Sequence, residues 1–241
     1  MPTEPQLKLF KYRHFEASLI LLCVRWYLRY SLSYRDLEEL MIERGLSVDH
    51  TTIYRWVQHY APILEKRCRA KLKPTNDSWR VDETYIKVKG QWLYLYRAVD
   101  SDGNTIEFML TPRRNAVSAK RFFRKALRSR HTVSPRVINV DRNPSYPKAV
   151  NKLKKKGILP KECKLRPVKY LNNLIEGDHR FIFIKRRVQP GMGLWSYETA
   201  WRTIQGYEAT NQLRKGQVKG TTKGDIMSQN RFVSRAFGLA A

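Results

Sequence analysis

The clearest pattern along the chain is the alternation of apolar and polar side chains in three consecutive short segments. These segments are residues 79–88, 92–99 and 105–111. A period of two residues predicts β-strands, and the turn-forming residues between the segments, Lys89-Gly90-Gln91 and 100–104, are short enough to join them as hairpins. The pattern therefore predicts an antiparallel meander of three strands.

The second half of the chain mixes helical and strand-like patterns. A helix capped by Asn115 and reaching about Arg128 precedes a strand at 136–140. A strand that follows a crossover helix is expected to pair in parallel. Further segments are predicted as a helix at 146–156, a strand at 163–168, and helices at 170–187 and 197–215. The expected fold class is α/β, a mixed five-stranded sheet flanked by helices.

The first quarter of the chain has helical periodicity instead. Helices are predicted at 17–30, at 34–44 with a capping box of Ser33 and Asp36, and from His50 to a stop before Pro62. Two helices joined by a short turn containing glycine form the helix-turn-helix pattern, and the start of the second helix of that pair reads DNA bases. The candidates for DNA contact are His50, Thr51, Thr52 and Arg55.

Charge narrows the choice of partners. The 241 residues hold 47 Lys and Arg against 21 Asp and Glu, a formal net charge of +26, which favours a polyanionic partner, double-stranded DNA first.

No segment has the ~20 apolar residues of a spanning helix, and the first residues lack a signal-peptide pattern, so no membrane association is expected. The three cysteines are widely spaced, which favours neither a disulfide nor structural zinc. A cytoplasmic location is expected.

Three acidic residues stand out from this basic background. Asp82 lies inside a predicted strand, Asp141 at the end of another, and Glu176 on a predicted helix. Such positions can converge on one edge of a sheet, and three carboxylates that share a small site need a cation. Two Mg²⁺ or Mn²⁺ ions suit oxygen ligands and phosphodiester displacement, so metal-dependent DNA strand cleavage and transfer is predicted. Glu83 should face the other side of the sheet and act as an ion-pair partner.

Several segments of the chain resemble bacterial insertion-sequence DDE transposases, most closely those of insertion-sequence family six. The motifs that carry the resemblance are residues 49–56, 79–85, 94–100, 172–180 and 214–217. Thirty-four residues separate Asp141 from Glu176, the spacing of the family's DD(34)E signature. The resemblance implies a ribonuclease H-like, integrase-type core and a metal-binding triad of Asp82, Asp141 and Glu176. It also implies transposition through cointegrates. Because the chemistry involves two DNA ends, a homodimer or larger assembly is expected.

One segment departs from the family pattern. Phe-Ile occurs twice in succession at 181–184, and the position seven residues after Glu176 is a phenylalanine where the family has a basic residue. Arg180 and Arg187 return to the side of Glu176 on an ideal helix, whereas Lys185 points away. Any of these three basic residues could steady a substrate phosphate. The insertion could instead mark an inactive copy.

The expected domains follow from these patterns. They are a basic arm at 1–16, a helix-turn-helix domain at 17–73, a linker at 74–78, a catalytic domain at 79–217 and a basic tail at 218–241, which is disordered or packs on a partner. Two other functions stay open. One is a DNA-binding regulator or inactive transposase remnant, and the other is a structure-selective nuclease, against which the helix-turn-helix argues.

Overall fold

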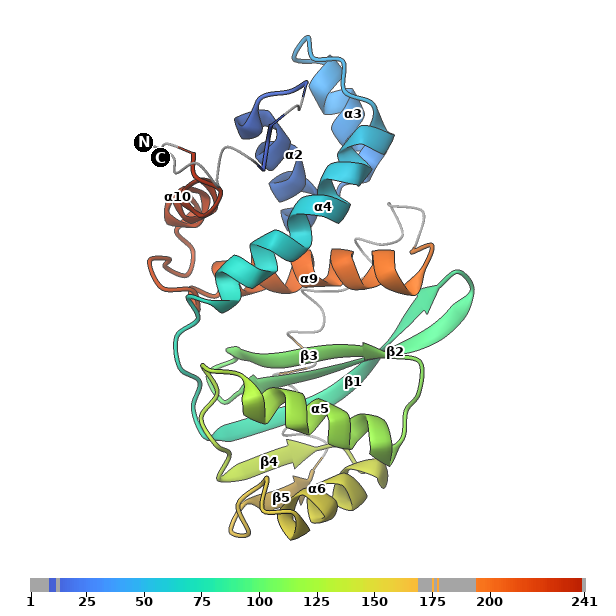
Figure 1. Cartoon of the computed structure of the whole chain (residues 1–241), viewed down its shortest axis with the longest axis vertical. Coiled ribbons are helices and arrows are strands. Elements are labelled where there is room, and N and C mark those ends of the chain that lie inside the picture. The colour runs from blue at the N-terminus through green and yellow to red at the C-terminus, as the bar shows by residue number, and fades with distance from the viewer. Residues whose placement is uncertain (1–8, 12–13, 169–174, 176, 178–193, 240–241) are drawn as a thin grey trace. The chain divides into compact units, whose positions relative to one another are not determined.

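The computed structural model of the chain describes residues 9–11, 14–168, 175, 177 and 194–239. Contacts divide the chain into two units. One contains Met1–Leu72 and Ile182–Ala241, and the other contains Lys73–Phe181. The first unit is helical and the second is built around a β-sheet (Figure 1).

The second unit contains a five-stranded mixed sheet of order β3-β2-β1-β4-β5. The strands are β1 (Ser78–Val88), β2 (Gln91–Asp100), β3 (Thr105–Thr111), β4 (Val137–Val140) and β5 (Lys164–Pro167). The first three strands pair antiparallel, and β4 pairs in parallel with both β1 and β5. The predicted meander and the predicted parallel pairing after a crossover helix are both confirmed. This strand order and direction define a ribonuclease H-like core.

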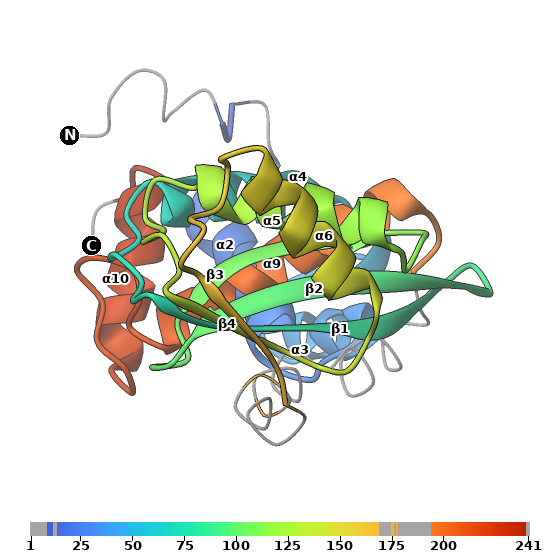
Figure 2. The same cartoon turned by 90° about the horizontal axis from the view of Figure 1, so that it is seen from below.

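Helices α5 (Ala116–Arg128) and α6 (Ser145–Lys155) lie side by side over one face of this sheet (Figure 2). As predicted, α5 begins at Asn115, whose side chain accepts a hydrogen bond from the backbone N–H of Ser118 at 2.9 Å. The core between helices and sheet includes Trp79 and Val81 of β1 and Phe122 of α5, all fully buried. The side chains of β1 alternate, so this face of the strand is apolar up to the point where Glu83 follows.

The first unit begins with the predicted helix-turn-helix region. It comprises α2 (Ala17–Arg29), α3 (Tyr34–Ile42) and α4 (His50–Arg69). The expected capping box at the start of α3 is present, because Ser33 and Asp36 exchange hydrogen bonds between side chain and backbone. The predicted apolar stripe of α4 is buried along its first half, at Ile53, Trp56, Val57 and Tyr60.

Helix α4 does not end before Pro62, so that prediction was wrong. Pro62 lies inside the helix, where it cannot donate a hydrogen bond to the carbonyl of Gln58 and costs about 3 kcal/mol. The apolar stripe nevertheless continues beyond the proline, with Leu64 and Cys68 buried. The side chain of Gln58 also donates a hydrogen bond to the hydroxyl of Thr203 at 2.8 Å. Tertiary packing therefore outweighs the local preference to stop.

That packing partner is α9 (Tyr197–Arg214), which lies along α4 (Figure 1). Gly206 of α9 fits closely between two helices, because a Cβ atom there would lie 2.6 Å from Leu28 and 2.7 Å from Ala61. The sequence places this helix at the end of the catalytic domain, whereas in space it belongs to the helical unit. Helix α9 is buried on all sides, and its buried residues include the polar Thr203, Glu208 and Asn211, so its sequence pattern does not show which core it joins.

The C-terminal segment also differs from expectation. It was expected to be disordered or to pack on a partner, but it contains α10 (Ile226–Ala236), which begins at Asp225 with a side-chain hydrogen bond to the N–H of Ser228 at 3.0 Å. The guanidinium of Arg67 contacts the Phe237 ring at 4.5 Å and bonds the carbonyl of Ala236. No helix in the described part of the chain is long and apolar enough to cross a membrane.

Candidate active site

The parallel register of two strands places two of the predicted acids at the same level. Arg80 of β1 lies opposite Asn139 of β4, and Asp82 and Asp141 each lie two residues further along their strands. Asp141 directly follows β4, as predicted. Because adjacent strands are separated by about 4.8 Å, the two carboxylates lie close together at the C-terminal end of the short strand β4.

A third carboxylate joins them. One oxygen each from Asp82, Glu83 and Asp141 lies within 4.8 Å of the others. Asp82 and Asp141 are partly exposed, whereas the Glu83 side chain is fully buried. A set of carboxylate oxygens at this spacing fits a hard divalent cation such as Mg²⁺ or Mn²⁺. The other predicted site residues, Glu176, Arg180, Lys185 and Arg187, lie outside the described residues.

Glu83 is held by three donors from two separate segments of the chain. Its Oε1 accepts hydrogen bonds from the Arg114 guanidinium and from the amide of Asn143 at 3.0 Å, and its Oε2 accepts one from the hydroxyl of Tyr146. The predicted role of Glu83 as an ion-pair partner is confirmed. A buried carboxylate with three donors meets the usual requirement that buried charge be paired and hydrogen-bonded.

Arg114 links Glu83 to Asp141. It lies in the loop between β3 and α5, and besides Glu83 it donates to Asp141 Oδ2 at 3.2 Å and to the Tyr85 hydroxyl at 3.2 Å. Sequence reasoning missed Arg114, Asn143 and Tyr146. The only clue was a buried acid that needed a cation, and nothing in the sequence shows which of the many arginines approaches it.

Burial and the charges in this cluster shift the pKa values of Arg114 and Tyr146. Partial burial lowers the pKa of Arg114, but the hydrogen bond and the negative charge of Glu83 outweigh this effect, so the net shift is upward. Burial, together with the neighbouring charge of Glu83, raises the pKa of Tyr146 well above its usual value. Both groups therefore stay protonated and act as hydrogen-bond donors at neutral pH.

A second arginine is paired with Asp82 in the sheet. Arg97 of β2 is the direct cross-strand neighbour of Asp82 and is fully buried. Side chains of directly opposite residues have Cβ atoms about 5 Å apart, so the two side chains leave the sheet from neighbouring positions on the same face. The sequence predicts that a carboxylate at this position needs a positive partner, and the sheet pairs it with a basic residue.

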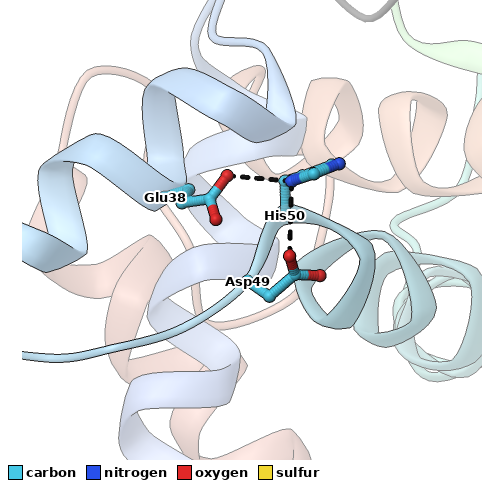
Figure 3. Close-up of side chains that lie close together, drawn as sticks. All are labelled: Glu38, Asp49 and His50. Carbon is cyan, nitrogen blue, oxygen red and sulfur yellow. Dashed lines mark hydrogen bonds and ion pairs between the residues drawn. The ribbon is translucent and has the colours of Figure 1, made fainter.

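The predicted DNA-contact residues lie at the start of α4. His50 Nδ1 lies 2.8 Å from Glu38 Oε2 and 3.5 Å from Asp49 Oδ2, so the first residue of α4 is linked to α3 (Figure 3). Thr51 is exposed, and both its backbone N–H and its hydroxyl donate to Asp49 Oδ1. Thr52 is partly exposed and Arg55 is exposed. Thr51 and Arg55 lie on the side of α4 opposite to its buried stripe.

Comparison with known proteins identifies the family. A family model described as a DDE domain matches residues 76–217. The transposase for insertion sequence-like element IS431mec of Staphylococcus aureus (strain N315) is 42% identical over 207 residues, 86% of this chain and 88% of the relative. The transposase for insertion sequence element IS257 in transposon Tn4003 of Staphylococcus aureus has the same identity and coverage. The chain belongs to the DDE transposases of insertion-sequence family six.

The chain is also similar to solved structures. The catalytic core domain of HTLV-2 integrase in complex with magnesium, in its dimeric form, is 17% identical, with a TM-score of 0.45, and the match covers 64% of this chain and 95% of that core. The ribonuclease H-like assignment rests on the strand order described above. A DDE domain implies use of a divalent metal, which agrees with the carboxylate chemistry of Asp82 and Asp141.

Proposed function

We propose that this transposase binds the terminal inverted repeats of its insertion sequence and catalyses metal-dependent DNA strand cleavage and strand transfer. The observation that carries the proposal is the convergence of Asp82 and Asp141 at one sheet edge, with oxygens within 4.8 Å. Family membership supports the same activity. Cointegrate formation, the route that the resemblance implies, is part of the proposal.

Asp82, Asp141 and Glu176 are proposed to hold two Mg²⁺ or Mn²⁺ ions. Bound there, the metals would supply an activated hydroxyl and neutralise charge on the departing oxygen. The protein's part is to hold the carboxylates in place. Arg180, Lys185 or Arg187 is proposed to steady the phosphate that is attacked.

DNA recognition is assigned to the helix-turn-helix. The N-terminal residues of α4 are proposed to contact bases and phosphates, with His50, Thr51, Thr52 and Arg55 as the contacting side chains. The exposure of Thr51 and Arg55 supports this role. The net charge of +26 supports a DNA partner, because neutralised phosphates contribute much of the affinity. Two DNA ends require at least a homodimer on the transposon ends and target DNA.

The test is a strand-transfer assay with purified protein, Mg²⁺ and labelled DNA that carries the inverted repeats flanking its own gene. Joined products should require metal and should disappear in Asp82→Asn, which keeps the side-chain shape but removes the charge. The matched control is Asp102→Asn in the exposed β2–β3 turn, which should retain full activity.

Three results would contradict the proposal. Specific binding of the ends without cleavage by the wild-type protein would indicate a DNA-binding remnant. Cleavage of branched DNA without dependence on the ends, and without joining, would indicate a nuclease. Unchanged activity in Asp82→Asn would remove Asp82 from the catalytic site.

A further inference from the structure

The starting observation is an excess of carboxylates at the metal-site edge. Glu83 comes as close to Asp82 and Asp141 as a ligand would, within 4.8 Å, and it is the most deeply buried of the three. Buried carboxylates attract cations strongly, because little water screens their charge. The side chains around these three carboxylates must therefore determine whether Glu83 or the two aspartates bind the metal.

Both carboxylate oxygens of Glu83 are engaged by hydrogen-bond donors. Its two oxygens accept three hydrogen bonds, from Arg114, Asn143 and Tyr146, and the guanidinium also neutralises its charge. A metal that binds through Glu83 would have to compete with these three donors inside a fully buried site. Asp82 and Asp141 differ from Glu83 in being partly open to solvent.

Asp141, by contrast, is held in one orientation. Its Oδ2 accepts from Arg114 at 3.2 Å and its Oδ1 accepts from the backbone N–H of Asn143 at 3.0 Å. Each oxygen accepts one hydrogen bond on one side and retains a second lone pair. The carboxylate is thus fixed in direction before a cation arrives, which is the arrangement that second-layer partners impose on metal ligands.

We propose that Arg114, anchored by the buried Glu83, is a positioning residue of the metal site: it orients the Asp141 carboxylate and keeps Glu83 out of the ligand set. The proposal rests on the proposed metal site of Asp82, Asp141 and Glu176. Nothing in the sequence assigns this role to Arg114, which lies 31 positions from Glu83 along the chain.

The test compares metal affinity with activity in full-length variants. Mn²⁺ is titrated into the DNA-free protein by calorimetry, and strand transfer is measured separately. Arg114→Gln removes a nearby positive charge and releases Glu83, so Mn²⁺ should bind roughly tenfold more tightly while strand transfer falls at least roughly tenfold. A residue that only supports the fold would lower both affinity and activity, so the opposite directions identify positioning.

Three further variants sharpen the comparison. Arg114→Lys keeps the positive charge but lacks the guanidinium whose separate nitrogens donate to two carboxylates. Its affinity for Mn²⁺ should therefore stay near wild type while its strand-transfer activity falls. The double variant of Arg114→Gln with Glu83→Gln removes the released carboxylate, so affinity should return toward wild type without restoring activity. It also removes both charges of the Arg114–Glu83 ion pair, so no unpaired buried carboxylate remains and it should fold even if Arg114→Gln does not. Arg113→Gln, one residue away and exposed, should behave as wild type.

The outcomes separate this inference from the function on which it rests. If Asp82→Asn abolishes Mn²⁺ binding but Arg114→Gln leaves or weakens it, the metal site stands and the role of Arg114 is refuted. Equal effects of Arg113→Gln and Arg114→Gln would also refute it, since they would reflect general charge. If the wild-type protein binds no Mn²⁺, or Asp82→Asn binds it normally, both the proposed metal site and this inference fail.

Discussion

Replacement of Gly206 by alanine tests how closely α9 packs in the helical unit. An alanine Cβ would lie 2.6 and 2.8 Å from the two Leu28 methyl carbons and 2.7 Å from the Ala61 Cβ. Leu28 can shift its methyl groups only within a fully buried site, and the Ala61 Cβ is fixed to the backbone of α4. The helices must therefore move apart, although alanine is intrinsically the better helix former.

Two opposing magnitudes decide the expected result. Alanine in place of glycine inside a helix stabilises by about 1 kcal/mol, whereas overpacking a tight core costs about 1–3 kcal/mol. Because three contacts fall below 3.0 Å, the overpacking cost should be about 2–3 kcal/mol, which leaves a net decrease in the free energy of unfolding of about 1–2 kcal/mol. For a chain of this size, that corresponds to a decrease in Tm of roughly 2–8 °C.

The assay is thermal unfolding followed by far-ultraviolet circular dichroism. Ala61→Gly returns the space taken by the new methyl group, so the double variant should be more stable than the two single effects predict. An increase in Tm for Gly206→Ala alone, as helix propensity by itself requires, would refute the close packing of α9 against α2 and α4.

Two other substitutions probe the fold. Asp100 is fully buried and accepts hydrogen bonds from the backbone N–H groups of Asn76, Asp102 and Asn104 and from the Asn104 amide. Asp100→Ala leaves these donors without acceptors and should lower the free energy of unfolding in urea by about 3 kcal/mol, and a loss under about 1 kcal/mol would contradict the network. Pro62→Ala allows a hydrogen bond to the Gln58 carbonyl and should raise Tm, because proline inside a helix costs about 3 kcal/mol relative to alanine. A lower Tm would show that α4 is not continuous at that point.

Local patterns were sufficient for most elements of the sheet unit. The bounds predicted for β3 and α5 match the structure, because alternation and the Asn115 cap are local properties. The proximity of Asp82 and Asp141 followed from a parallel pairing that the crossover helix required. That part of the candidate site could be predicted from the sequence.

The rest depends on contacts between distant parts of the chain. Pro62 is accommodated because α9 packs against α4, and Arg114 meets Glu83 because a loop after β3 returns to β1. Tyr146 reaches the same carboxylate from 63 positions away. Neither periodicity nor propensity encodes which of many basic or aromatic residues makes such a contact, so these features emerged only from the structure.

Metal-directed cleavage of the protein's own backbone locates a bound divalent ion without depending on DNA chemistry. Iron(II) is bound in place of Mg²⁺, ascorbate and hydrogen peroxide are added, and the ends of the fragments are mapped by mass spectrometry. If Asp82, Asp141 and Glu176 share one metal site, cuts should cluster near all three positions and should disappear with excess Mg²⁺ or in Asp82→Asn. Cuts near Asp82 and Asp141 but none near Glu176, or cuts that excess Mg²⁺ does not suppress, would contradict the shared site.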